Sequence, residues 1–127
     1  MTAVDDFAQG KRVLLVEDDP AIRTLTSQFL AMAGYVVVEA CDADEALAKA
    51  QVETPFDLLL TDIIMPGLDG RSLAHALAAE HPGLRTLYVT GYPEDALTPD
   101  SDDEVDVLIK PFQRQALIDK LHEILSR

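Results

Sequence analysis

The chain has 127 residues, 48% of them hydrophobic, and its 10 Lys and Arg against 23 Asp and Glu give a formal net charge of −13. This length and composition suit a single domain with a hydrophobic core. The negative charge disfavours nucleic acid and anionic membranes as partners, because their phosphate groups would be repelled. No apolar run is long enough to span a membrane, no secretory signal precedes the domain, and one cysteine cannot form an internal disulfide, so we expect a cytoplasmic protein.

Short apolar runs alternate with amphipathic segments along the whole chain. The runs RVLLVE, YVVVEA, FDLLLTD, LRTLYVT and VDVLI predict strands at 12–17, 35–40, 56–62, 84–90 and 105–109. Helical periodicity predicts helices over 20–33, 43–52, 70–81 and 114–127. We assign residues 1–10 to an N-terminal tail and 11–127 to the domain.

The first predicted helix has clear signals at both ends. Pro20 suits its first turn and Gly34 its stop. Four apolar residues recur inside it at helical spacing: Ile22, Leu25, Phe29 and Met32. At the start of the next helix, Asp42 and Glu45 form a plausible N-terminal capping pair, because carboxylates there accept hydrogen bonds from backbone N–H groups that lack helical partners.

The predicted strands are apolar on both faces, which is typical of a parallel sheet covered by helices on each side. We therefore predict an open α/β sandwich, although the strand pattern alone does not decide the order of the strands. Residues 91–104 break the alternation, since they contain Pro93, Pro99 and six acids. The helix expected between the last two strands is therefore predicted to be short or disordered.

Polar residues follow the predicted strands at the edge where an open parallel sheet binds its ligands. Asp18 and Asp19 come after the first strand, and Glu17 stands just before them with its direction left open. The other strand ends that contribute polar groups are those with Asp62, Thr90 and Lys110. Clustered carboxylates repel one another without a cation, and Mg²⁺ suits a site of oxygen ligands. A carboxylate beside Mg²⁺ and a lysine is equipped to attack phosphorus and form an aspartyl phosphate.

Four sequence blocks, VEDD, LLLTDIIMPGLDG, VTGY and IKPF, occur in this order over about residues 11–126. Together they resemble the receiver domain of two-component response regulators. The resemblance implies a flavodoxin-like sheet of order 2-1-3-4-5. It also implies that Asp62 is the phosphoacceptor, that Thr90 and Lys110 contact the phosphoryl group, and that Pro111 follows a cis peptide bond. The metal ligands that it implies are Asp18, Asp19, Asp62 and the backbone carbonyl of Ile64.

The resemblance further implies a signalling role. A histidine kinase or histidine phosphotransfer protein would donate a phosphoryl group from phosphohistidine to Asp62 in a Mg²⁺-dependent step, and the product would switch protein–protein contacts. Such a domain is not a turnover enzyme. One alternative is a pseudo-receiver that binds proteins without being phosphorylated. We expect no DNA-binding helices in this sequence, and a stand-alone receiver and a piece of a hybrid kinase both stay open.

Two features depart from the usual receiver pattern: the proline- and acid-rich segment 91–104 replaces the fourth helix, and an aromatic residue is missing from the fifth strand. Val107 stands three residues before Lys110, where the family commonly has an aromatic switch residue. We therefore expect the switch to involve Thr90, Val107 and Tyr92, with Tyr92 as the candidate moving ring. Outside the site, Cys41 is predicted to be a small buried hydrophobe. The three histidines at 75, 81 and 122 are expected at the surface.

Overall fold

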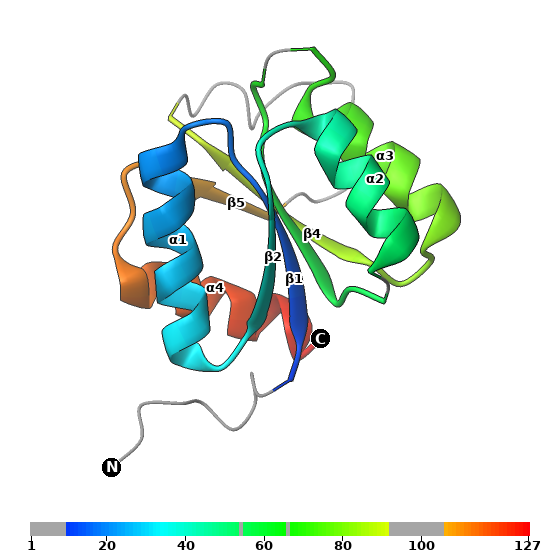
Figure 1. Ribbon diagram of the computed structural model, residues 1–127. Coiled ribbons are helices and arrows are strands. Elements are labelled where there is room, and N and C mark those ends of the chain that lie inside the picture. The colour runs from blue at the N-terminus through cyan, green and yellow to red at the C-terminus, as the bar shows by residue number, and fades with distance from the viewer. Residues whose placement is uncertain (1–9, 54, 66, 92–105) are drawn as a thin grey trace.

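The computed structural model describes residues 10–53, 55–65, 67–91 and 106–127. From Arg12 to Thr90 the strands and helices alternate, as the sequence predicts (Figure 1). The strands are β1 (Arg12–Val16), β2 (Val36–Ala40), β3 (Leu58–Asp62), β4 (Arg85–Thr90) and β5 (Asp106–Ile109). The helices are α1 (Pro20–Ala33), α2 (Ala43–Val52), α3 (Gly70–Glu80) and α4 (Arg114–Leu125).

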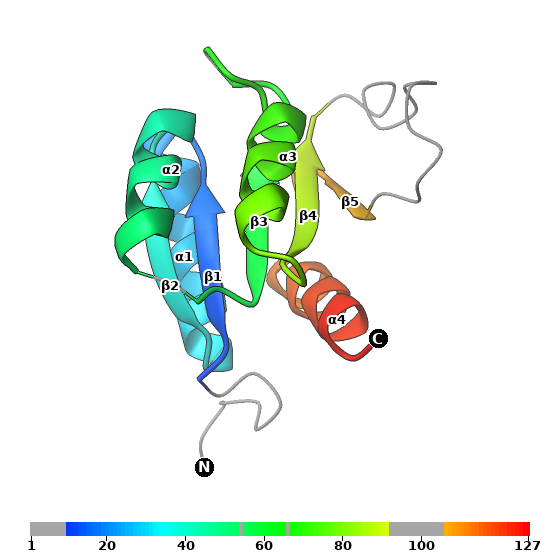
Figure 2. The same ribbon diagram turned by 90° about the vertical axis from the view of Figure 1, so that its right-hand side faces the viewer.

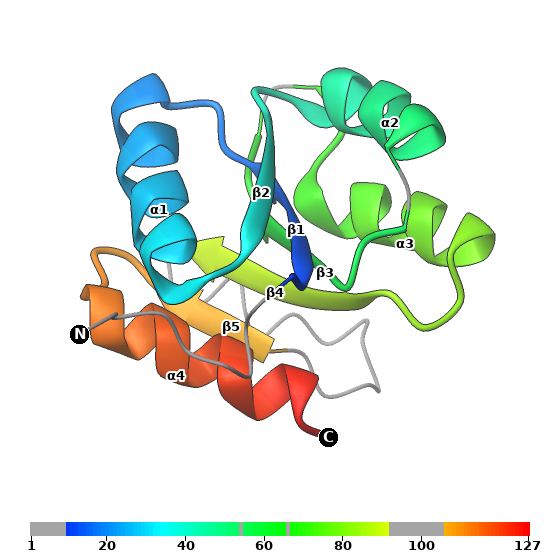
Figure 3. The same ribbon diagram turned by 60° about the horizontal axis from the view of Figure 1, so that its bottom comes forward.

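The strands form one parallel sheet in the order β2-β1-β3-β4-β5, which confirms the order implied by the resemblance. Figure 2 shows them in this sequence from one edge to the other. Helices α1 and α4 cover one face of the sheet, and α2 and α3 cover the other (Figure 3). The chain is therefore a three-layer α/β sandwich, and the carboxyl ends of the two central strands, β1 and β3, lie next to each other.

The central strands are buried on both faces because successive side chains point in opposite directions. In β1, Val13 and Leu15 belong to the core cluster formed with α1 and α4, whereas Leu14 and Val16 belong to the cluster that contains the small alanines of α2. The residues of β3 divide in the same way, and all five are buried. This double burial explains why these strands appear in the sequence as continuous apolar runs.

The ends of the helices follow the predicted capping signals. Gly34 ends α1 with a φ of 105°, a left-handed conformation that glycine adopts without a steric penalty. Asp42 caps α2 by accepting a hydrogen bond from the Glu45 N–H at 2.8 Å. The Glu45 side chain in turn accepts from the Cys41 N–H at 2.7 Å. The predicted Asp42–Glu45 capping pair is confirmed.

The apolar spacing in α1 does not coincide with its buried face, and the predicted burial of Cys41 is wrong. In α1, Leu25 is 50% exposed and Met32 is 49% exposed. The face of α1 that is buried carries Thr26, Leu30 and Ala33 instead. Cys41 is exposed, because it lies where the chain leaves β2 and turns into the cap of α2.

Several predictions fall wholly or partly outside the described residues. They concern the N-terminal tail, of which only Gly10 is described, the proposed switch residue Tyr92, and the short or disordered helix within 91–104. Among the histidines, His75 and His122 are exposed and His81 is partly buried. None of the described helices is long and apolar enough to cross a membrane.

Candidate functional site

Polar side chains from four strands meet at the carboxyl edge of the sheet. Glu17 and Asp18 directly follow β1, Asp62 and Thr90 are the last residues of β3 and β4, and Lys110 directly follows β5. An open cleft of about 260 Å³ lies at this edge. Its lining consists of Asp18, Asp62, Ile64, Val89, Thr90, Gly91 and Lys110. The structure thus brings together Asp18, Asp62, Thr90 and Lys110, as the sequence predicts.

Lys110 is the cation that allows two carboxylates to be buried here. Its Nζ lies 2.7 Å from Oδ1 of Asp62 and 2.7 Å from Oε1 of Glu17. Asp62 is only 6% exposed and Glu17 only 4% exposed. A buried carboxylate without a charged partner would be strongly disfavoured, so Lys110 balances the charge of this pair.

The two buried acids differ in their affinity for a proton. Burial, together with the hydrogen bond that protonated Asp62 donates to Glu17, raises the pKa of Asp62 to about 8, although Lys110 opposes the shift. Burial also opposes ionisation of Glu17, but its hydrogen bonds with Asp62 and Lys110 leave its pKa lowered. The same contacts raise the pKa of Lys110 despite its burial. Of the two acids, Asp62 therefore takes up a proton more readily than Glu17.

Three carboxylates are close enough to hold a metal ion. Oxygens of Glu17, Asp18 and Asp62 all lie within 4.8 Å of one another. Such a set of hard oxygen donors, with one exposed acid facing the cleft, suits Mg²⁺. The donor chemistry and the close grouping of the three acids both fit a divalent cation.

The resemblance implies that Asp19 is a metal ligand, but in the structure its side chain caps α1. Its Oδ1 accepts hydrogen bonds from the N–H groups of Ala21 at 2.9 Å and Ile22 at 3.2 Å, so Asp19 caps α1. Glu17 takes its place in the carboxylate cluster. The sequence contained a signal for this assignment, because Pro20 at the first helical position makes Asp19 the N-cap.

The loop that follows Asp62 is held by backbone hydrogen bonds. The Ile63 N–H donates to the Val89 carbonyl at 3.1 Å, and the Gly70 N–H donates to the Ile63 carbonyl at 2.8 Å. Ile64 comes next and lines the cleft with a side chain that is 56% exposed. The role of its backbone carbonyl as a metal ligand stays a prediction.

Thr90 and Lys110 are held together through their backbones. The Lys110 N–H donates to the Thr90 carbonyl at 2.8 Å, which extends the β4–β5 ladder into the site. The peptide bond between Lys110 and Pro111 is cis, as the resemblance implies. Val107 is half-buried in β5 and lies opposite Tyr88 of β4. The switch roles of Thr90 and Val107 are not tested by these contacts.

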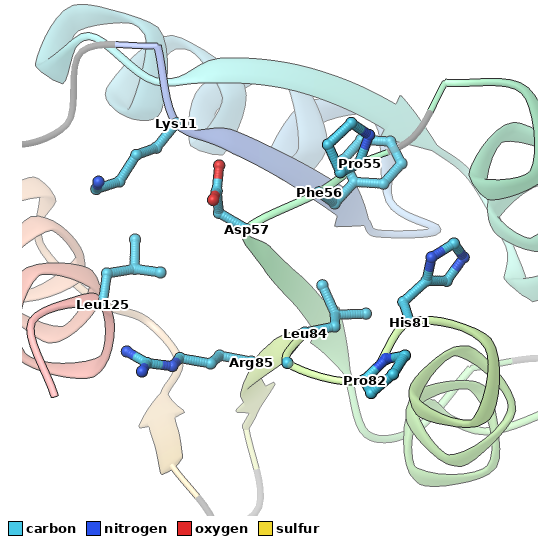
Figure 4. Close-up of a pocket in the computed structure, with 10 residues that line it drawn as sticks. Lys11, Pro55, Phe56, Asp57, His81, Pro82, Leu84, Arg85 and Leu125 are labelled. Carbon is cyan, nitrogen blue, oxygen red and sulfur yellow. The ribbon is translucent and has the colours of Figure 1, made fainter.

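A second, larger cavity of about 440 Å³ lies at the opposite, amino-terminal end of the sheet (Figure 4). Lys11, Asp57 and Arg85 line one part of it, and Phe56 and Leu84 line another. It contains none of the carboxylates that could hold a metal. Cavity size therefore does not identify the chemically equipped site.

The sheet order and the carboxylate–lysine cleft at its edge are those of a receiver domain, a class that is generally a signalling domain rather than a turnover enzyme. Residues 13–122 match the response regulator receiver domain, so the chain belongs to this family. It is 41% identical over 117 residues to the response regulator receiver protein CpdR of Brucella abortus, covering 91% of this chain and 97% of CpdR. It is 34% identical over 125 residues to the sensor kinase CckA of the same organism, covering 96% of this chain but 13% of CckA.

Solved structures support the same assignment. The chemotaxis protein CheY4 of Vibrio cholerae is similar with a TM-score of 0.81 and 32% identity, covering 91% of this chain and 98% of CheY4. A CheY-like receiver domain protein from Methanospirillum hungatei is similar with a TM-score of 0.82 and 35% identity, covering 93% of this chain and 95% of that protein. The flavodoxin-like fold predicted from the sequence is confirmed.

Proposed function

We propose that this chain is the phosphoacceptor domain of a two-component phosphorelay, and that Asp62 receives the phosphoryl group from a phosphohistidine. One observation carries the proposal above all. The Asp62 carboxylate lies at the carboxyl edge of the sheet, where its Oδ1 forms an ion pair with Nζ of Lys110 at 2.7 Å and two further carboxylates lie close by. A buried acid with this combination of partners has no structural task that an apolar residue could not fulfil at lower cost.

The residues of the cleft supply the parts of a phosphoryl transfer. A carboxylate oxygen of Asp62 attacks phosphorus, the phosphorus–nitrogen bond of the donor breaks, and the electron pair leaves with the imidazole, which takes a proton. The Lys110 ammonium neutralises charge on the transferred group, and the Thr90 hydroxyl donates a hydrogen bond to one of its oxygens. The domain catalyses its own modification and slow dephosphorylation, and it does not turn over a substrate.

We assign the Mg²⁺ site to Glu17, Asp18 and Asp62, completed by the backbone carbonyl of Ile64. This assignment replaces Asp19 with Glu17, because the Asp19 oxygen that faces α1 already accepts two hydrogen bonds. When bound, the metal supplies positive charge to the phosphoryl oxygens. The chain's own part is to hold the three carboxylates close together at the edge of the sheet.

The donor in this proposal is a histidine kinase or a histidine phosphotransfer protein, and the output is a change in protein–protein contacts. The similarity to CckA, a sensor kinase, supports a place in such a relay. The expected route of the signal runs from Thr90 through Val107 in the neighbouring strand, together with Tyr92. The pseudo-receiver alternative keeps the fold and the protein contacts but not the phosphorylation.

Intact-mass measurement after incubation with acetyl phosphate tests the proposal. The wild type is expected to gain one phosphoryl group with Mg²⁺ and none with EDTA. Asp62→Asn is expected to gain none, and Asp44→Asn, which changes an exposed acid of α2, serves as the control and should be labelled like the wild type. Full labelling of Asp62→Asn would refute the assignment. A folded wild type that binds Mg²⁺ but stays unlabelled by acetyl phosphate and by a phosphohistidine donor would favour the pseudo-receiver.

A further inference from the structure

Arg23 of α1 turns its side chain back towards the end of β1. Its Nη1 donates a hydrogen bond to the backbone carbonyl of Glu17 at 2.8 Å. Its Nε lies 3.5 Å from a carboxylate oxygen of Glu39 in β2, and its side chain is only 22% exposed. An arginine one turn into a helix would otherwise extend into solvent, so this placement requires a reason.

The reason lies in the hydrogen bonds at the end of the β1–β2 ladder. The Glu17 N–H still bonds to the Ala40 carbonyl at 3.1 Å, which continues the ladder by one residue. Strand β2 ends at Ala40, and the chain then turns into the cap of α2, so no strand residue continues the ladder beyond this point. The Arg23 guanidinium provides the donor for the next carbonyl. Without this donor, the carbonyl would be left unsatisfied in a partly buried place, which is unfavourable.

This carbonyl belongs to the peptide unit that joins Glu17 to Asp18. The orientation of that unit sets the direction of both acids, one inward to Lys110 and the other into the cleft. The Glu17 side chain is held separately, by Lys110 and by the Asp19 N–H at 3.1 Å. Arg23 is thus the side chain that fixes the backbone between the two acids.

We propose that Arg23 is a positioning residue for the metal site: it orients the Glu17–Asp18 peptide, and through it the two carboxylates, without contacting the metal or the phosphoryl group. This inference rests on the proposed metal site. Groups that orient metal ligands typically change metal affinity by 10- to 100-fold when they are removed. We therefore expect Arg23 to act on Mg²⁺ affinity, and on phosphorylation only through that affinity.

The sign of the effect separates this role from simple electrostatics. Arg23 carries a positive charge close to a site for a dication, and like charges repel. If Arg23 acted only through its charge, removing it would strengthen Mg²⁺ binding. If Arg23 holds the carboxylates in place, removing it weakens binding although the repulsion is lost.

The experiment compares calorimetric Mg²⁺ titrations of the wild type, Arg23→Met and Glu39→Gln. Each protein is titrated at a temperature where circular dichroism shows it to be folded. Arg23→Met keeps most of the aliphatic stem but removes the donors and the charge. We expect it to bind Mg²⁺ roughly tenfold more weakly. Glu39→Gln keeps the contact between Arg23 and the Glu17 carbonyl, so its affinity is expected to stay within about twofold of the wild type. Arg23→Gln, with the same expected weakening, guards against a folding defect in Arg23→Met.

Phosphorylation by acetyl phosphate gives a second readout. At Mg²⁺ concentrations below saturation, the Arg23 variants are expected to be labelled more slowly than the wild type, and at saturating Mg²⁺ the rate should recover. Unchanged or tighter Mg²⁺ binding in both Arg23 variants would overturn the inference, as would an equal loss in Glu39→Gln. A wild type that does not bind Mg²⁺ would overturn the proposed metal site itself, which is a different result.

Discussion

Gly70, the first residue of α3, packs against the backbone of Asp62 at the end of β3, and we predict that Gly70→Ala is strongly destabilising. A Cβ built on Gly70 would lie 1.9 Å from the carbonyl oxygen of Asp62 and 2.9 Å from its carbonyl carbon. Since carbon and oxygen normally approach to about 3.3 Å, a shift of roughly 1.4 Å is required. The opposing atoms belong to the backbone of a buried strand and cannot rotate away.

The magnitude follows from three contributions. Overpacking of this kind costs about 3 kcal/mol, the upper part of the range for cores. Disturbing the 2.8 Å hydrogen bond from the Gly70 N–H to the Ile63 carbonyl adds about 1 kcal/mol. The higher helix propensity of alanine returns about 1 kcal/mol. The net loss of unfolding free energy is therefore about 3 kcal/mol, which corresponds to a fall in Tm of roughly 10–15 °C for a domain of this size.

Thermal unfolding followed by circular dichroism, with Mg²⁺ absent, measures this effect. Gly91→Ala is the matched control, because a Cβ there meets nothing within 4 Å and its φ is not in the left-handed region. We expect its Tm to stay within about 2 °C of the wild type. A Tm for Gly70→Ala within about 3 °C of the wild type would show that the Asp62 loop yields easily, and the reasoning from the close approach would be refuted.

Three further predictions concern the caps and the cleft. Asp42→Ala removes the acceptor for the Glu45 N–H and should lower the unfolding free energy by about 1 kcal/mol in urea titrations, whereas an unchanged midpoint would contradict the capping role. In EDTA, Asp62→Asn should melt above the wild type by a margin that widens from pH 4 to pH 8. The reason is that the pKa of Asp62 is raised to about 8 in the folded wild type, well above its ordinary value. The wild type therefore loses stability as the pH rises through this window, whereas the neutral amide of the variant does not titrate. A margin that is constant with pH would argue against this reasoning. Ile64→Asn places an amide at the exposed mouth of the cleft, where it can hold an attacking water, and should shorten the lifetime of the phosphorylated state severalfold, as followed by intact mass. Equal lifetimes in the two proteins would count against that role for position 64.

The sequence was sufficient to predict that Asp62, Thr90 and Lys110 meet at one edge. Each ends or directly follows an apolar run, and parallel strands bring their carboxyl ends to the same side of a sheet. The caps at Asp42 and Gly34 were equally predictable, because they depend on neighbours within a few residues. The order of the strands did not follow from periodicity and came only from the resemblance of four sequence blocks.

Only the tertiary structure decided which face of α1 is buried. The helix carries apolar residues on two faces, and hydrophobic spacing selects the stripe with Leu25 and Met32 as readily as the one with Leu30 and Ala33. Packing against the sheet and α4 decides between them. These contacts set the rotation of the helix about its own axis, and they involve residues that are distant in the sequence. Helical periodicity gives the width of an apolar face but not its contact partner.

Tertiary contacts also decide how the acids between β1 and α1 are oriented. Pro20 marks Asp19 as the N-cap in the sequence, but the direction of Glu17, whose N–H makes a hydrogen bond just beyond the end of β1, is not given there. In the structure Glu17 turns inward to Lys110, Asp19 turns to the N–H groups of α1, and Asp18 alone faces the cleft. Lys110 lies 93 positions further along the chain, so the partner that fixes Glu17 becomes its neighbour only when the sheet has formed.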